Sequence, residues 1–233
     1  MIKYENKITC KIVFHNDLLE DDVDRIVDYF KIDFKDNIKV HDRMLLINQE
    51  GMKSLNISSD EITIADFSFE EFSKKVCGNI IILESIIEIL NIKDDYLIFL
   101  EIEGEYHTER EVIQESEEQQ SNIEQSNIEQ SDIGRLANLV NGSIITEDFK
   151  LLNPLLMGVE FYIMINKLAG ILNIKNMTDC YFIKLETYLK EGQGVEVISE
   201  VFNEMKNIIE NNTLLLLEKI AEESEVLEGD SCC

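Results

Sequence analysis

A low-complexity stretch at 109–135 most strongly limits how this chain can fold, because it separates two apolar regions. From Glu109 to Ser131 the sequence repeats Ser-Asn-Ile-Glu-Gln, is rich in Glu, Gln and Ser, and has no aromatic residue. Such a segment buries too little apolar surface to offset the entropy of ordering. It predicts a disordered acidic linker, and a solvated helix is the alternative because Glu and Gln favour helices. The predicted domains are 1–108 and 136–224, with the linker at 109–135 and an acidic tail at 225–233.

The first region switches between strand-like and helix-like spacing of its apolar residues. Alternation at 7–15 is typical of a half-buried strand, and spacing of three and four residues over 20–30 predicts an amphipathic helix. The same patterns predict three further strands and one further helix, at 38–48, 61–67, 96–102 and 69–90. The resulting order, β-α-β-β-α-β, predicts an α+β fold whose N-terminal part is a small ferredoxin-like sandwich.

The apolar periodicity also predicts which side chains form the core of this first domain. The expected core residues are Phe14, Ile26, Phe30, Ile64, Phe72, Leu83, Ile87, Leu97 and Phe99.

The second region is predicted to be mainly α-helical. Asn153 and Pro154 are a favourable start for a helix reaching about residue 172, and a long helix is expected over 195–223. This long helix contains four consecutive leucines, which cannot all face one core. Leu214 and Leu217 are therefore predicted to bind a partner. The alternative is a helix buried between two layers of its own domain.

Two segments of the sequence are similar enough to indicate an internal repeat. The segment from Ile62 to Glu101 can be aligned with that from Ile144 to Glu186, and both contain Ile-Leu-Asn-Ile-Lys, at 89–93 and 171–175. A duplication would give two related helix-plus-strand units. Because these residue types are abundant in the chain, chance similarity is the alternative.

Charge is the most unusual feature of the composition. The chain has 47 acidic and 21 basic residues, for a net charge of −26. Like charges repel, so direct binding to nucleic acid or to an anionic membrane is not expected. A partner protein with a basic surface fits this charge, and self-association through apolar residues is also open. The sequence has no signal-peptide pattern and no apolar stretch that predicts a membrane span, and its five cysteines suggest no disulfide framework, so a cytoplasmic location is expected.

No known motif predicts a catalytic, cofactor-binding or metal site. His107 and Glu111 would be one helical turn apart, with Glu109 between them, but this group lies where the predicted linker begins. His15 and His41 have no identifiable nucleophile at a useful spacing. The terminal pair Cys232–Cys233 resembles a doubly prenylated tail, yet acidic neighbours oppose contact with an anionic membrane.

Together these features predict a non-enzymatic acidic protein–protein interaction module, such as an adaptor, assembly factor or regulator. A DNA-mimic inhibitor of a nucleic-acid-binding protein is one alternative. An enzyme with an unrecognised site is the other.

Overall fold

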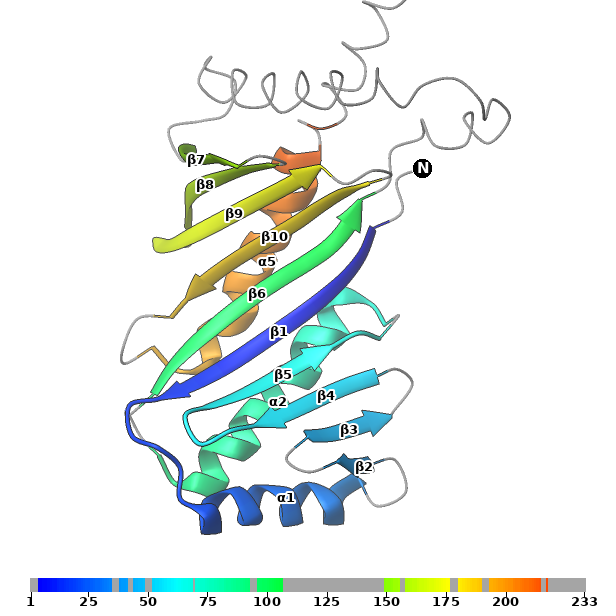
Figure 1. Cartoon of the computed structure of the whole chain (residues 1–233), viewed down its shortest axis with the longest axis vertical. Helices are drawn as coiled ribbons and strands as arrows, with labels where there is room; N and C mark the ends of the chain where they lie inside the picture. Colours follow the sequence, from blue (N-terminus) through cyan, green and yellow to red (C-terminus); the bar gives the residue numbers. More distant parts are fainter. Residues whose placement is uncertain are drawn as a thin grey trace, which may run out of the picture. The chain divides into compact units, whose positions relative to one another are not determined.

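The fold was analysed in a computed structural model, shown in Figure 1. The structure describes residues 4–34, 38–41, 44–48, 52–68, 70–92, 96–106, 149–155, 158–176, 180–189, 193–214 and 217. The predicted linker at 109–135 and the predicted tail at 225–233 lie outside these residues, so both remain predictions.

The chain divides into two compact units. The N-terminal unit contains Asn6–Ile102 and Glu186–Asn203, and the C-terminal unit contains Met1–Glu5, Glu103–Leu185 and Glu204–Cys233.

The N-terminal unit is an antiparallel sheet with helices (Figure 1). Its elements are β1 (Tyr4–Phe14), α1 (Glu20–Phe34), β2 (Ile38–His41), β3 (Met44–Asn48), β4 (Met52–Ile57), β5 (Glu61–Asp66), α2 (Phe72–Leu90), β6 (Tyr96–Tyr106) and the short helix η1 (Val195–Val197) that leads into α5 (Ile198–Asn207). The strand order is β2-β3-β4-β5-β1-β6. The last residues of β10 (Tyr181–Tyr188) lie beside β6, where the Leu189 N–H donates to the Ile98 carbonyl at 2.8 Å.

The core of this unit lies between the sheet and α2. The residues of β1 that the alternation predicted to be buried, from Ile8 to Phe14, are all buried. The buried side of β1 continues onto β5, where Ile64 is the residue paired with Cys10. Leu83 is fully buried on α2, and Phe72 at the start of α2 packs edge-on against Phe202 of α5, with ring centroids 6.4 Å apart.

Helix α1 begins at Glu20, where the sequence predicted a helix. Three carboxylates in its first turn, from Glu20 to Asp22, face the positive end of the helix dipole. Its buried stripe includes Ile26 and Phe30, as predicted, and Arg25 donates a hydrogen bond to the Ile89 carbonyl near the end of α2. The stripe and this bond hold α1 against α2.

The C-terminal unit contains a run of antiparallel strands followed by a helical segment. Its elements are β7 (Phe149–Leu155), β8 (Gly158–Ile165), β9 (Leu168–Asn176), most of β10, the end of α5 and the π-helical segment η2 (Ile208–Thr213). The strand order is β10-β9-β8-β7. Its buried side chains include Phe161, Ile163, Leu172, Ile183, Leu185 and Met205.

The predicted fold class is therefore wrong. Where a mainly helical region was expected at 136–224, the described residues form four strands before the helical segment that begins at Val195. The ferredoxin-like order β-α-β-β-α-β is also wrong, because four strands, not two, separate α1 from α2.

The helix expected from Asn153 to about residue 172 is replaced by β7, β8 and β9. Asn166 and Lys167 both have positive φ, 47° and 65°, and they join β8 to β9 in a tight turn. Two positive φ angles in succession are typical of two-residue hairpins and are incompatible with an α-helix. Pro154 lies in β7, the last strand in the order, as expected for a proline confined to an edge strand.

The proposed repeat register is also inconsistent with the structure. Ile89 and Leu90 end α2 and Asn91 caps it with φ 51°, whereas the matching segment from Ile171 to Lys175 lies inside β9. The two copies of Ile-Leu-Asn-Ile-Lys therefore do not belong to equivalent helix-plus-strand units.

Candidate functional site

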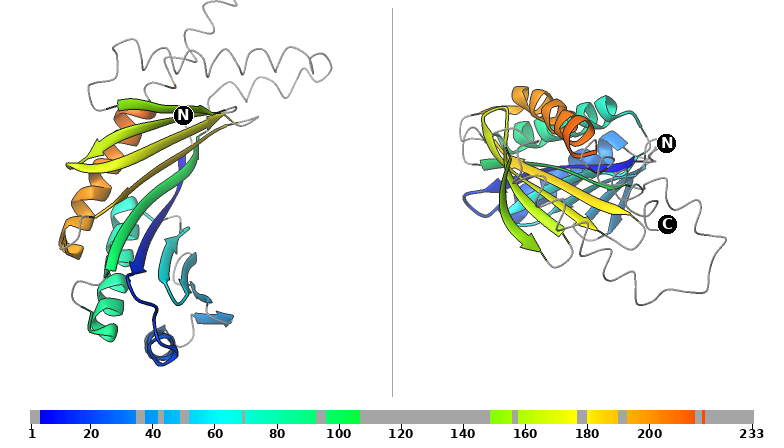
Figure 2. Two further views of the ribbon diagram at one scale, coloured as in Figure 1. Left: turned by 60° about the vertical axis from the view of Figure 1, so that its left-hand side comes forward. Right: turned by 90° about the horizontal axis from the view of Figure 1, so that it is seen from above.

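The sheet of the N-terminal unit has one face covered by α2, as Figure 2 shows. No helix or strand among the described residues of this unit lies across the opposite face, which we call the open face. Alternation along β6 assigns its side chains to the two faces. Ile98 and Leu100 are buried on the helix side, so Leu97, Phe99 and Glu101 point to the open face.

Two aromatic side chains meet on the open face. The rings of Phe99 on β6 and Tyr188 on β10 have centroids 6.0 Å apart and planes tilted by 47°. Phe99 is 38% exposed and Tyr188 is 46% exposed. The hydrogen bond from Leu189 to Ile98 fixes the end of β10 against β6 and so holds the rings together. We call Phe99 and Tyr188 the aromatic pair.

Carboxylates accompany the aromatic pair on both strands. Glu101 follows Phe99 by two residues on β6, and Glu186 precedes Tyr188 by two residues on β10, so strand alternation puts them on the same face. The open face therefore combines exposed rings with acidic groups.

The lysines of the open face already have partners. Lys11 on β1 forms an ion pair of 3.1 Å with Glu61 on β5. Lys7 places its ammonium group 5.1 Å from the centroid of the Phe67 ring, which is 44% exposed. An exposed ring of this unit thus holds a cation by a cation–π contact.

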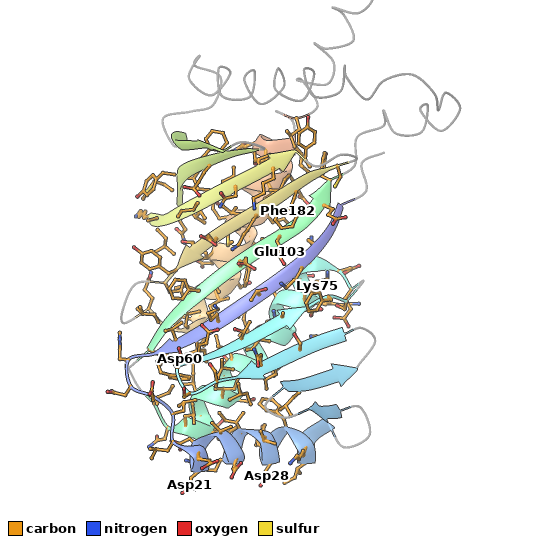
Figure 3. All side chains as sticks on the ribbon, in the orientation of Figure 1. Asp21, Asp28, Asp60, Lys75, Glu103 and Phe182 are labelled. Carbon is orange, nitrogen blue, oxygen red and sulfur yellow. The ribbon has the colours of Figure 1, made fainter. Side chains whose placement is uncertain are left out.

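On the other face, buried polar groups cluster between the sheet and α2. Asp66 is fully buried, accepts a hydrogen bond from the Ser68 N–H at 2.8 Å, and lies 3.2 Å from the ammonium group of Lys53. The distance between Lys53 Nζ and Asp66 Oδ2 is that of an ion pair. The two groups are not aligned for a hydrogen bond, and Asp66 Oδ2 has no hydrogen-bond partner. Lys75, labelled in Figure 3, donates to the Asn6 carbonyl at 2.7 Å. Solvent is largely excluded from these groups, so we assign them to the core.

Cys10 belongs to this buried region and is not a nucleophile. Burial raises the pKa of its thiol to about 12, and a side-chain hydrogen bond with Asn79 opposes that rise only in part. Because the reactive form of cysteine is the thiolate, a thiol with this pKa is inert near neutral pH.

The residues predicted to bind a partner lie in the C-terminal unit, after the π-helical segment. Thr213 donates its hydroxyl hydrogen to the Ile208 carbonyl at 3.2 Å, which spans the wider turn of a π-helix. Leu214 is half-buried and Leu217 is fully buried. Partner binding by these leucines stays a prediction, and the burial of Leu217 is what the alternative core role requires.

Among the other candidate residues, the structure describes only His15 and His41. His15 is exposed just after β1, and His41 ends β2. The group at His107, Glu109 and Glu111 and the pair Cys232–Cys233 lie outside the described residues. Within the described part of the chain, no group of three or more His, Cys, Asp or Glu side chains is placed to hold a metal ion. No helix of that part is both long and apolar enough to cross a membrane.

The aromatic pair was missed because Phe99 was predicted to be a core residue. The sequence of β6 contains the necessary signal, since Glu101, Glu103 and Glu105 share one parity and mark the polar side of the strand. Phe99 has the same parity as these glutamates and therefore belongs to the open face.

No protein-family model matches the sequence, and no characterised protein is significantly similar to it.

Proposed function

We propose that this chain is a non-enzymatic interaction module that binds a basic segment of another protein on the open face of its N-terminal unit. The observation that carries the proposal is the aromatic pair, Phe99 and Tyr188, exposed beside Glu101 and Glu186 on a face that no described element covers. Exposed rings next to acidic groups match a partner with cationic and apolar groups.

The net charge of the chain supports a basic partner. At −26 the chain attracts cationic proteins over long range and repels nucleic acid and other polyanions. Exposed charges are screened beyond about 8 Å at physiological ionic strength, so this attraction accelerates encounter more than it holds the complex. The rings would supply most of the lasting affinity. An adaptor, an assembly factor or a regulator would each use such a surface.

The proposal is tested by locating the binding of cationic peptides on the full chain. Isothermal titration with a lysine- and arginine-rich peptide is compared between two double variants that change the net charge equally. One is Glu101→Gln with Glu186→Gln on the open face, and the other is Asp21→Asn with Asp24→Asn on the exposed side of α1. Circular dichroism checks that all variants fold.

The expected result is that the open-face variant weakens binding about tenfold, the effect of losing roughly 1.4 kcal/mol, and the α1 variant changes it little. Equal weakening by both variants would mean that net charge alone drives binding, and the proposal would fail. Sedimentation of the unmodified chain completes the test, because a stable homodimer that covers the open face would assign this face to self-association instead.

A further inference from the structure

We infer that the partner segment binds in an extended form, with one apolar side chain on the aromatic pair and a second on Phe67 at the other end of the open face. The inference rests on the proposed function, because it names the shape and the anchoring side chains of the segment that the open face would take. We call the aromatic pair and Phe67 the two anchors.

Phe67 and Tyr188 occupy equivalent positions at the ends of two strands. Every second residue is buried up to Asp66 in β5 and up to Thr187 in β10. The next residue is Phe67 in the first case and Tyr188 in the second, and their side chains are 44% and 46% exposed. A single exposed ring is ordinary on a protein surface, but an exposed ring at the same position of two strands is a repeated feature.

Both rings belong to the open face, because each lies against a side chain of that face. The Lys7 ammonium group is 5.1 Å from the centroid of the Phe67 ring, and Lys7 belongs to β1, the strand that pairs with β5. Tyr188 lies against the Phe99 ring of β6, the strand beside β10. These contacts position the rings, and the exposed part of each ring remains for a partner.

The two anchors are far apart on the open face. The strands β5, β1, β6 and β10 are consecutive in the sheet, so β5 and β10 are three strand spacings apart, about 14 Å. In addition, β5 ends beside the start of β1, and β10 ends beside the start of β6. Because β1 and β6 run in opposite directions (Figure 1), these starts lie at opposite ends of the face, and the anchors are separated by more than the strand spacings alone.

This separation determines the length of the segment that reaches both anchors. An extended chain rises about 3.4 Å per residue, so two of its side chains reach both anchors only when they are about five or more residues apart. The net charge of −26 selects a basic segment, and a segment rich in like charges repels itself and is extended. The partner segment therefore has two apolar side chains separated by a basic stretch.

The test uses the full chain and Gly/Ser/Lys peptides of equal length and equal charge, each with two phenylalanines. The phenylalanines are at positions i and i+6, which span about 20 Å when extended, or at i and i+2, which reach one anchor at a time. The variants are Phe67→Thr, Tyr188→Thr and both together, because threonine suits a strand and removes the ring. The control is Tyr29→Thr, which removes a ring that is 41% exposed on α1. Titration calorimetry gives the affinity, and NMR shifts of the rings report where the peptide binds.

We expect the i,i+6 peptide to bind about fivefold more tightly than the i,i+2 peptide, because a second aromatic contact forms within the same complex. Phe67→Thr and Tyr188→Thr should each remove this advantage, and Tyr29→Thr should leave it unchanged. The i,i+2 peptide should lose ring-dependent binding only in the double variant, since either anchor alone can hold it. Equal affinity of the two peptides, or an advantage that survives Phe67→Thr, overturns the inference.

The two proposals fail in distinguishable ways. If cationic peptides bind the open face with the same affinity at either spacing, the two-anchor inference is wrong and the interaction function stands. If no cationic peptide shifts the signals of the open face, both are wrong.

Discussion

Gly78→Ala should destabilise this protein, although the same change in most helices is stabilising. Gly78 lies within α2, where alanine is ordinarily favoured over glycine by about 1 kcal/mol. A Cβ atom at this position, however, would collide with the ammonium group of Lys53. That group lies 3.2 Å from Asp66 Oδ2, and Asp66 is fully buried. Glycine therefore makes room for a buried ion pair.

The expected magnitude follows from the competition between these two effects. Moving the flexible end of Lys53 is easy in itself, but it leaves a buried carboxylate without its counter-charge. Removing one partner of a buried pair costs about 3–5 kcal/mol, which is an upper bound here because Lys53 is displaced and not removed, and the helix propensity of alanine returns about 1 kcal/mol. Lys53 keeps 13% of its side chain exposed, which favours the lower end of the range. We expect a net loss of about 2 kcal/mol in the free energy of unfolding.

Urea unfolding of four proteins tests this explanation: the unmodified chain, Gly78→Ala, Lys53→Met and the double variant. When Lys53 is absent the collision is absent as well, so Gly78→Ala should become stabilising by about 1 kcal/mol in the Lys53→Met background. A reversal of sign between the two backgrounds is the expected result. If Gly78→Ala stabilises the unmodified chain, or has the same effect in both backgrounds, the collision with Lys53 is not what the glycine avoids.

Three further predictions concern burial. Leu83→Ala should lower the free energy of unfolding in urea by about 2–5 kcal/mol, because Leu83 is fully buried on α2, and a change near zero would contradict this packing. Leu217→Asp should unfold the C-terminal unit by near-ultraviolet circular dichroism and Leu214→Asp should not; if both unfold it, docking through Leu214 is wrong. Stability should fall as the pH rises above 9.0, because the Cys10 thiol ionises near that pH when unfolded but only near 12 when folded, and Cys10→Ala should reduce this pH dependence.

In the N-terminal unit, local periodicity predicted the type and buried side of individual elements correctly, but it did not predict how many strands there are. The spacing of Val23, Ile26 and Phe30 matches the buried stripe of α1, and the alternation in β1 matches its buried side. The predicted strand at 38–48 is instead two strands, β2 and β3, paired through His41 and Met44. A hairpin is easily read as one strand when neither glycine nor proline marks the place where the chain turns.

The same difficulty explains the failure in the C-terminal unit. The turn between β8 and β9 is formed by Asn166 and Lys167, and only the asparagine is a residue that commonly adopts positive φ. Buried residues occupy alternate positions in β8, as Phe161 and Ile163 do. Tyr162 between them is apolar enough to obscure this two-residue period in the sequence. A proline after an asparagine then favoured a helix start over an edge strand. Pairing across the sheet, which a single sequence does not reveal, decided between them.

Recognising the candidate site from the sequence requires knowing on which side of a strand each residue lies, and residue type alone does not tell this. Hydrophobicity alone assigns Phe99 to the core, and five of the nine predicted core residues are indeed buried, namely Phe14, Ile26, Phe30, Ile64 and Leu83. Phe99 differs because the glutamates that follow it at every second position fix which side of β6 faces water. Tyr188 had no such marker in its own sequence, since its role depends on β10 lying beside β6, a contact between strands more than 70 residues apart in sequence.

The order of elements offers a better basis for an internal repeat than the matching pentapeptides do. Twice along the described chain a leading strand is followed by a group of four strands and then a helix: β1, β2 to β5 and α2, with α1 as an additional helix after β1, and then β6, β7 to β10 and α5, with η1 before α5. In both series the last of the four strands pairs with the leading strand, β5 with β1 and β10 with β6. In this correspondence Ile62 and Ile64 of β5 match Ile183 and Leu185 of β10, which are likewise buried at alternate positions. A buried alternating pattern reflects an equivalent position in a sheet. The pentapeptide Ile-Leu-Asn-Ile-Lys does not, because it occurs at a helix end that Asn91 caps and also inside a strand.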